Sequence, residues 1–468
     1  MYNRISAQLG RQTREYLRHG PTIGDVGALA AGIRDGLAAA RGIAAEEPVC
    51  LCLEERHHLL AALLASLAGG PPLILPHAFD PPVLREIRET QPYRLILTDR
   101  WIDPPPGAEA IAMKAFHPAD RPLPLLRPPQ EPFLSLFTGG STAKPRMWQK
   151  TAANLFGEAI HLAKIFAVGD GDLIVSTAPP QHIYGLLGSV LLPFVSGARV
   201  LPRTCAFPRE ITAAIEEEKP TLLVSVPIHY RALKNSALGR HSLRLALSSA
   251  APLESEDGAF FLARTGLRIT EIYGSTETGG MATRRFGMDN GLWEPFTCLA
   301  WRTLSDRLCV RSPFVSPDLP RDGEGFYVTA DRVAAAEANR FMFLGRSDRI
   351  VKIGGKRVDL DEIREKIRRI PGVSDAYVAA VPGKGTGRLE IAALVAGSGP
   401  ARALAAAIRS LEIPYGRPRR VRIVKAIPVC GNGKIDREAI EKLLSAPHRP
   451  PAGAALTAAT PPPSPREP

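Results

Sequence analysis

Short apolar runs alternate with amphipathic stretches along the first 270 residues of the chain. Apolar runs bounded by turn-forming residues predict buried strands, and longer stretches with apolar residues at helical spacing predict helices. The predicted strands are 49–53, 72–75, 93–98, 133–137, 172–177, 198–201, 221–226, 243–248 and 267–273. Helices are predicted between them, among others at 58–67, 151–166 and 185–195. This alternation predicts a large N-terminal layered α/β domain.

The pattern changes after residue 300. Residues 301–333 alternate over short distances and predict a β-rich subdomain, and a second domain begins near Arg346. That smaller domain is predicted to be α+β, with helices at 360–370, 401–411 and 436–444 and strands at 376–381, 389–395 and 420–424. The predicted domains are therefore 1–346 and 347–446, followed by a Pro/Ala-rich tail at 447–468 that is predicted to be disordered. Residues 104–130 are rich in proline and are predicted to be a surface connection.

Composition narrows the class of protein. A chain of 468 residues with 45% hydrophobic and 23% charged residues is typical of soluble globular proteins with more than one domain. No apolar run reaches the ~18 residues of a membrane span, and the polar N-terminus lacks a signal-peptide core. We therefore expect a cytoplasmic protein. Its six cysteines are scattered without a C-x-x-C pair, which argues against a zinc site and a disulfide framework.

The positive charge is unevenly distributed. The net charge is +12, and residues 349–445 carry 20 Lys and Arg against 10 Asp and Glu. Such a basic domain could meet a phosphorylated cofactor, an acidic carrier protein or nucleic acid. Nucleic acid is the weaker alternative, because aromatic residues do not accompany the charge.

A glycine-rich stretch at 135–151 follows one predicted strand. It contains small and hydroxylated residues after the apolar run, namely Thr138, Gly139, Gly140, Ser141 and Thr142. Backbone N–H groups of such a loop can converge on phosphate oxygens. Lys144, Arg146 and Lys150 add positive charge. A plain turn is the alternative, and the stretch does not fit the P-loop pattern G-x-x-x-x-G-K-[ST].

Four further motifs follow in order. They are EIYGSTETGG at 271–280, YVTAD at 327–331, GRSDRIVKIGGKRV at 345–358 and PVCGNGKIDR at 428–437. Together with the glycine-rich stretch, this series resembles the adenylate-forming superfamily of acyl- and aryl-CoA synthetases, peptide-synthetase adenylation domains and firefly luciferase. The resemblance extends over residues 25–445.

The resemblance implies a two-step reaction. A carboxylate attacks the α-phosphate of ATP to give an acyl-adenylate and pyrophosphate, and a thiol then displaces AMP. The implied cofactors are ATP, Mg²⁺ and a thiol acceptor, either CoA or the phosphopantetheine of a carrier protein. Because two anions must meet, cations and backbone donors have to neutralise them. The substrate is expected to be a small aromatic or fatty carboxylic acid.

The resemblance also implies roles in nucleotide binding. Residues expected at the β- and γ-phosphates are Thr138, Gly140, Ser141, Thr142 and Lys144. Tyr273 is expected to stack on adenine beside Gly274 and Ser275, with Ala250 and Ala251 as an adenine wall for which a simple turn is the alternative. Thr276 is expected to bind the α-phosphate, and Glu277 to hold Mg²⁺ through its hard carboxylate oxygens. Asp331 is expected to accept both ribose hydroxyls and Arg346 to donate to the ribose.

The small domain is expected to be mobile about a hinge at Asp348. Lys434 is expected to act between the carboxylate and the α-phosphate in the first step. After rotation, Lys352, Gly354 and Gly355 would replace it and form the thiol tunnel. His182 matches a gate beside the acyl pocket, with a core histidine as the alternative. Residues assigned to that pocket by position are Tyr184, Ser225, Pro227, His229, Gly279 and Met281.

Some positions depart from the superfamily pattern. Ala143 and Arg146 replace the usual Gly and Lys of the glycine-rich loop, and Ala330 replaces a Gly, which bears on pyrophosphate handling. The hypothesis is an ATP-dependent acid–thiol ligase, with a carrier protein slightly favoured over free CoA. A non-catalytic scaffold that binds nucleotide or carrier protein is the rival, and a nucleic-acid-binding protein is a distant third.

Overall fold

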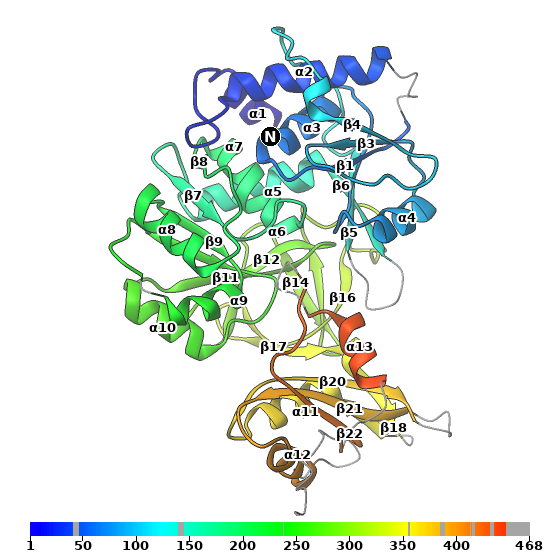
Figure 1. The fold of residues 1–468 in the computed structure, drawn as a ribbon, viewed down its shortest axis with the longest axis vertical. Coiled ribbons are helices and arrows are strands. Elements are labelled where there is room, and N and C mark those ends of the chain that lie inside the picture. The colour runs from blue at the N-terminus through cyan, green and yellow to red at the C-terminus, as the bar shows by residue number, and fades with distance from the viewer. Residues whose placement is uncertain are drawn as a thin grey trace, which may run out of the picture. The chain divides into compact units, whose positions relative to one another are not determined.

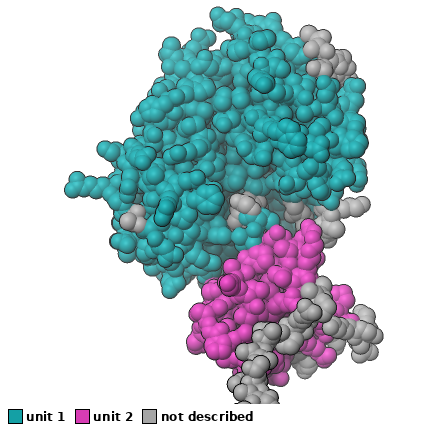
Figure 2. All heavy atoms as spheres, in the orientation of Figure 1, with its two compact units in different colours: residues 1–348, 429–434 teal, residues 349–428, 435–468 magenta. Residues whose placement is uncertain are grey.

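The computed structural model describes residues 1–40, 46–138, 145–236, 238–353, 356–383, 389–411, 413, 417–430 and 435–445. The chain divides into two compact units (Figure 2). The first comprises 1–348 with 429–434, and the second comprises 349–428 with 435–468. Predicted site residues outside the described parts are Gly140, Ser141, Thr142, Lys144, Gly354, Gly355 and Lys434. The predicted tail at 447–468 lies outside them too.

A six-stranded sheet forms the N-terminal part of the first unit, in the order β4-β3-β1-β2-β5-β6. Its strands are β1 Val49–Cys52, β2 Leu73–Leu75, β3 Leu95–Thr98, β4 Glu109–Ala112, β5 Pro132–Thr138 and β6 Arg146–Thr151. All neighbouring strands are parallel except β5 and β6. The helices are α1 Tyr2–Leu9, α2 Ile23–Ala40, α3 Arg56–Leu67, α4 Pro81–Thr90 and the short η1 Met113–Ala115.

Side-chain alternation places helices on both faces of this sheet. Val49 and Leu51 of β1 belong to a core shared with α2 and α3, whereas Cys50 and Cys52 belong to a core shared with α4. Since successive strand residues point to opposite faces, α3 and α4 cover opposite faces. The apolar runs thus lie between two helical layers (Figure 1).

The sequence analysis was wrong at two places in this sheet. Residues 104–130 were predicted to be only a surface connection, yet they contain the edge strand β4, which pairs with β3. In β4 only Ile111 is fully buried, so its apolar pattern is weak. Residues 146–151 were assigned to the glycine-rich stretch, but they form β6, antiparallel to β5.

The second sheet of the first unit has eleven strands, in the order β14-β15-β16-β17-β13-β12-β11-β10-β9-β7-β8. The first five in sequence are β7 Leu173–Ser176, β8 Arg199–Val200, β9 Leu222–Ser225, β10 Leu245–Ser248 and β11 Ile269–Ser275. The rest are β12 Gly279–Arg285, β13 Leu292–Pro295, β14 Ala300–Leu304, β15 Arg307–Arg311, β16 Tyr327–Ala336 and β17 Arg340–Arg346. Strands β7 to β11 run parallel, and pairing becomes antiparallel from β11–β12 onward. The predicted β-rich region therefore continues the parallel sheet.

The helices of this part are α5 Ala152–Ile165, α6 Ile183–Leu186, η2 Leu187–Leu191, α7 Leu192–Ser196, α8 Pro208–Glu218, α9 Pro227–Ala232, η3 Leu233–Asn235 and α10 Ser255–Thr265. Helix α5 begins after Thr151, whose hydroxyl accepts from the N–H of Asn154 while the Asn154 side chain accepts from the N–H of Thr151. It contacts β6, β12 and α7 (Figure 1). Helix α5 therefore contacts both sheets of the first unit, through β6 in one and β12 in the other.

The second unit begins at Arg349, the last residue of the short helix η4 Ser347–Arg349. It contains the hairpin β18 Ile350–Ile353 and β19 Lys356–Asp359, then the sheet of β20 Val373–Pro382, β21 Leu389–Gly397 and β22 Arg420–Val424. Its helices are α11 Leu360–Arg368, α12 Ala401–Ser410 and α13 Arg437–Ser445. Ile363 and Ile408 pack on one face of the sheet and Ile440 on the other. The predicted fold class, a large α/β part with a smaller α+β part, is confirmed.

Candidate active site

The turn between β11 and β12 carries the most distinctive motif. A Cβ atom on Gly274 would lie 2.3 Å from the carbonyl oxygen of Gly279, so no other residue fits there. Gly279 has a φ of +68°, which also favours glycine. Within the turn, Ser275 Oγ and Thr278 Oγ1 are 2.8 Å apart. These constraints fix a tight turn that presents Thr276 and Glu277.

The side chain of Tyr273, directly before this turn, contacts Asp331 of the YVTAD motif. Its hydroxyl donates a hydrogen bond to Asp331 Oδ2 on β16. Its ring packs against Trp293 and Phe341, with centroids 5.1 and 5.9 Å away. Burial and the nearby Asp331 carboxylate raise the pKa of Tyr273 well above its usual value. The tyrosine therefore stays neutral and keeps its proton for Asp331.

Arg346 joins the same carboxylate from the neighbouring strand. Asp331 and Arg346 are directly opposite in the β16–β17 ladder, and Arg346 Nη1 lies 3.0 Å from Asp331 Oδ1. The other nitrogens of Arg346 donate to Asp348, at 3.0 and 2.7 Å. Hydrogen bonding to Asp348 raises the pKa of Arg346 above its usual value, and burial raises that of Asp331. Asp348 is the last residue before the second unit begins.

A second turn, after β10, lies beside Tyr273. Ser249 Oγ donates to the carbonyl oxygen of Ile272 at 2.8 Å, which tethers this turn to β11. Ala250 adopts a φ of +77° and is exposed, while Ala251 is partly exposed. A non-glycine residue in this left-handed region is strained, and such strain often occurs at binding sites. The structure thus brings together Tyr273, Asp331 and Arg346, and it ties the turn that contains Ala250 to the strand that carries Tyr273.

Residues predicted for the acyl pocket meet at the carboxyl ends of β7 and β9. Thr177 Oγ1 lies 2.9 Å from Ser225 Oγ and 2.7 Å from His229 Nδ1. Burial lowers the pKa of His229, so its ring is neutral near pH 7. The sequence analysis had not singled out Thr177, although it ends the predicted strand 172–177.

Four other predicted site residues lie outside the strands that carry the Tyr273–Asp331–Arg346 cluster. His182 precedes α6, where its carbonyl oxygen accepts from the N–H of Leu186 at 2.7 Å. Burial raises the pKa of Tyr184 in the same helix. Thr138 ends β5, and its hydroxyl accepts from Trp148 Nε1 at 3.2 Å. Lys352 belongs to β18, but its side chain lies outside the described parts.

Lys150 does not act as a loop cation, contrary to the sequence analysis. Only 1% of the residue is exposed. Its ammonium donates to the carbonyl oxygens of Phe314, at 3.2 Å, and Glu277, at 3.5 Å. On α5, the buried Glu158 accepts the N–H of Gly280 at 2.7 Å. Burial lowers the pKa of Lys150 and raises that of Glu158.

The sequence contains a signal for some of these buried polar residues. Asn154 and Glu158 are polar positions four residues apart, the spacing of one helical turn, among mostly apolar residues at 152–160. One hollow of about 340 Å³ among the described residues is lined by Thr297, Cys298, Leu299, Ala300, Arg311, Ser312 and Pro313. None of the predicted site residues lines it. The site is therefore assigned from side-chain geometry.

Comparison with known proteins gives the family. The model of the AMP-binding enzyme family matches residues 22–296, which is more than half of the chain and includes Tyr273, Thr276 and Glu277. The chain belongs to this family. The predicted resemblance to the adenylate-forming superfamily is thereby confirmed.

Relatives and solved structures agree with this family. Sulfoacetate–CoA ligase of Cupriavidus necator is 27% identical over 371 residues, which cover 71% of each chain. The ATP-bound structure of an RpMatB–BxBclM chimera superposes with a TM-score of 0.80 at 19% identity, covering 95% of this chain and 99% of that one. O-succinylbenzoate coenzyme A synthetase of Bacillus subtilis, in complex with AMP, gives 0.79 at 17% identity, covering 94% and 98%. At these identities the two structures establish the fold of this family member.

Among the described residues, no helix combines the length and apolar character that a membrane crossing requires. No group of three or more His, Cys, Asp or Glu side chains in those parts could enclose a metal ion.

Proposed function

We propose that the protein activates a carboxylic acid with ATP as an acyl-adenylate and then transfers the acyl group to a thiol. The observation that carries this proposal is the meeting of Tyr273, Asp331 and Arg346 beside the fixed turn with Thr276 and Glu277. The names of the relatives, which are acid–CoA ligases, support the same class of reaction.

The described residues suit a nucleotide. Asp331 Oδ1 and Oδ2 each accept one hydrogen bond from the protein, and each oxygen has a second lone pair for a ribose hydroxyl. The aromatic ring of Tyr273 offers a face for adenine. The Thr276 hydroxyl would donate to the α-phosphate, where charge builds up during attack by the acid.

A single carboxylate at Glu277 suits a Mg²⁺ ion that is coordinated mainly by the phosphates of ATP. Mg²⁺ in nucleotide enzymes is commonly held by one or two carboxylates together with substrate phosphates. Glu277 would hold the ion, which when bound neutralises phosphate charge. The surrounding chain fixes the Glu277 main chain through the N–H of Ser316, at 2.8 Å, and through Lys150.

The small domain, residues 347–446, would supply the mobile groups. Lys434 would lie between the acid and the α-phosphate in the first step. In the second step the segment with Lys352, Gly354 and Gly355 would take its place and receive the thiol. Asp348, which already pairs with Arg346, is the proposed hinge.

CoA is the acceptor that the relatives favour, and a holo carrier protein is the alternative that the basic small domain suggests. The acid is proposed to be small, aromatic or fatty. His182, Tyr184 and the Thr177–Ser225–His229 cluster would border it.

The test is ATP–pyrophosphate exchange across a panel of aliphatic, aromatic and sulfonated carboxylic acids. Acid-dependent exchange supports the first step, and absence of exchange with every acid contradicts it. CoA and then a holo carrier protein are added to distinguish the two acceptors.

A non-catalytic nucleotide-binding scaffold is the second candidate. It is favoured by Ala143 and Arg146, which replace the usual residues of the glycine-rich loop. Binding of ATP in a calorimetric titration, without exchange for any acid, would support this candidate.

A further inference from the structure

Three buried polar side chains lie behind the turn that presents Thr276 and Glu277. They are Lys150 at the end of β6 and Asn154 and Glu158 on α5, and we call them the turn support. Their exposed fractions are 1%, 5% and 3%. A buried polar or charged side chain is unfavourable unless hydrogen bonds or an opposite charge compensate its loss of hydration. The contacts of each of these three side chains are therefore informative.

Lys150 holds the first half of the turn. Its ammonium donates to the carbonyl oxygen of Glu277, and it also donates to that of Phe314 in the segment after β15. The same Glu277 oxygen accepts the N–H of Ser316 at 2.8 Å. Glu277 is thus fixed through its main chain, which leaves its carboxylate available for other contacts.

Asn154 holds the segment that Lys150 also contacts. Its Nδ2 donates to the carbonyl oxygens of Pro313, at 2.7 Å, and Val315, at 3.3 Å. Since Ser316 follows directly, the amide fixes the donor that completes the hydrogen bonding of Glu277.

Glu158 holds the second half of the turn. Its Oε1 accepts the N–H of Gly280 at 2.7 Å. A Cβ atom on Gly279 would lie only 2.5 Å from Glu158 Oε2, so the carboxylate packs directly against the main chain. The side chains of Lys150 and Glu158 therefore hold the two ends of one turn by hydrogen bonds.

Stability alone is a weak explanation for this arrangement. Buried charged side chains can often be replaced by apolar residues of similar volume without loss of stability, because removing a charged group from water is unfavourable. Apolar side chains would fill the same space but could not hold Glu277 and Gly280 by hydrogen bonds. The retained charges are better explained by the position of the turn.

We propose that Lys150 and Glu158 are positioning residues that set the place of the Thr276 hydroxyl and the Glu277 carboxylate for the nucleotide. This inference rests on the proposed function, because it gives the turn its role. It assigns to the chain two groups that act on the reaction without touching the substrate.

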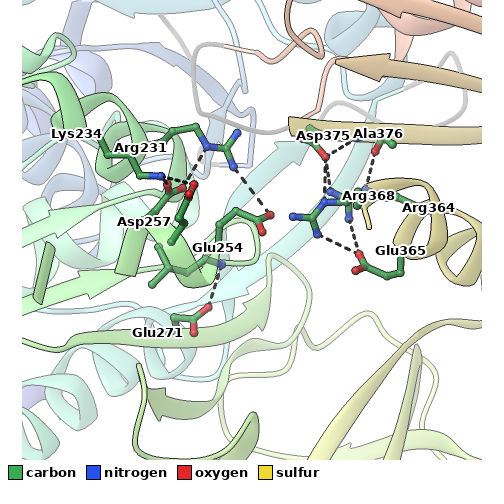
Figure 3. Close-up of polar contacts among 12 residues, drawn as sticks. Arg231, Lys234, Glu254, Asp257, Glu271, Arg364, Glu365, Arg368, Asp375 and Ala376 are labelled. Carbon is green, nitrogen blue, oxygen red and sulfur yellow. Dashed lines mark hydrogen bonds and ion pairs between the residues drawn. The ribbon is translucent and has the colours of Figure 1, made fainter. Parts of the chain in front are cut away.

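The test compares Lys150→Met, Glu158→Gln and the double variant with a control. Asp257→Asn is the matched control, since Asp257 is also a buried carboxylate of the first unit. It is paired with Arg231, at 3.2 Å, and with Lys234, at 2.6 Å, on α9 and η3, as Figure 3 shows. All four variants are measured for melting temperature and for the kcat and KM of ATP–pyrophosphate exchange per folded molecule.

Positioning predicts that Lys150→Met lowers kcat by about 100-fold, because a displacement of about 1 Å can have that effect. Glu158→Gln keeps an acceptor for the N–H of Gly280 and should therefore lower kcat by a smaller factor. Asp257→Asn should lower the melting temperature and leave kcat unchanged. If Lys150→Met and Glu158→Gln lose only melting temperature and keep the wild-type kcat, the inference is wrong.

If a single variant does not fold, the kcat of the double variant tests the inference instead. It leaves no unpaired buried charge and keeps an acceptor for the N–H of Gly280, but it lacks the ammonium that holds Glu277. A low kcat in the folded double variant supports positioning, whereas a wild-type kcat overturns it.

Calorimetric titration with Mg²⁺-ATP separates this inference from the proposed function. If the wild type binds Mg²⁺-ATP but exchanges with no acid, the function fails, and the inference is decided by binding. Binding at least about 10-fold weaker in the folded double variant then supports it, and equal binding contradicts it.

Discussion

The two compact units differ in how far their polar and charged side chains are buried. In the parts that the structure describes, every buried polar or charged residue belongs to the first unit. Asp257 of the first unit has only 1% of its side chain exposed between Arg231 and Lys234, whereas Asp375 of the second unit has 20% exposed beside Arg364 and Arg368 (Figure 3). The same residue type is thus buried in one unit and partly exposed in the other.

The difference has a physical reason. Removing a charge from water is unfavourable and is tolerated where hydrogen bonds define one geometry. In the first unit such groups surround the turn at 274–280 and the Tyr273–Asp331–Arg346 cluster. The second unit has an apolar interior and exposed ion pairs such as Lys366–Glu362. We infer that the buried charges of the first unit hold this turn and this cluster in one geometry.

Removal of the proposed mobile lysine should have the largest effect. Lys434→Ala removes the cation expected between two anions, and loss of one such group typically lowers the rate by about 100- to 1,000-fold. Exchange should fall by at least that factor, while thioester formation from supplied acyl-AMP should continue at the wild-type rate. An equal loss of both half-reactions would contradict separate roles for Lys434 and for the segment with Lys352, Gly354 and Gly355.

Glu277→Gln should have the next largest effect, in the first unit. The substitution keeps the shape of the side chain but removes the negative charge proposed to hold Mg²⁺. We expect exchange to fall by at least about 10-fold and to need a higher Mg²⁺ concentration, as for other changes around metal ligands. An unchanged Mg²⁺ titration curve would exclude this carboxylate as the ligand.

Asp331→Asn should weaken ATP binding. Hydrogen bonds to a charged group contribute about 1.5–3 kcal/mol, so the KM for ATP should rise by about 10- to 100-fold. The wild type should prefer ATP to 2′,3′-dideoxy-ATP, and the variant should bind both alike. If the variant keeps the wild-type preference, Asp331 does not bind the ribose.

Two aspartates test the difference between the units by stability alone. Asp257→Ala removes the buried partner of Arg231 and Lys234, which keep their pairs with Glu254 and Glu256. It should lower the free energy of unfolding of the first unit by about 1.5–3 kcal/mol, the usual contribution of hydrogen bonds to a charged group. Asp375→Ala removes a partly exposed pair and should change that of the second unit by less than about 1 kcal/mol. Urea unfolding with a probe in each unit measures both values, and equal losses would contradict the comparison.

The sequence predicted most of the fold because the strands are short apolar runs with clear boundaries. It missed β4 because only one of its residues is buried, and β6 because only two of its six residues, Met147 and Trp148, are apolar and the strand follows a glycine-rich loop. Periodicity describes neighbours within one element, so it cannot show which distant segments meet.

The candidate site was predictable in part. Motifs identified Tyr273, Asp331 and Arg346, but the hydrogen bond between Tyr273 and Asp331 joins residues 58 positions apart and required the fold. Lys150 was interpreted as a loop cation because a lysine is usually solvated. Its burial depends on the segments around Glu277 and Phe314, which lie more than 120 residues further along the chain.

The most direct test of the central claim follows oxygen atoms. An acid that supports exchange is labelled with ¹⁸O in its carboxylate and is turned over with ATP and CoA or a holo carrier protein. If the carboxylate attacks the α-phosphate, the carbon–oxygen bond breaks in the second step and AMP retains one labelled oxygen. Mass spectrometry should therefore find one ¹⁸O in AMP and none in pyrophosphate. Label in inorganic phosphate together with ADP as the product would contradict an acyl-adenylate.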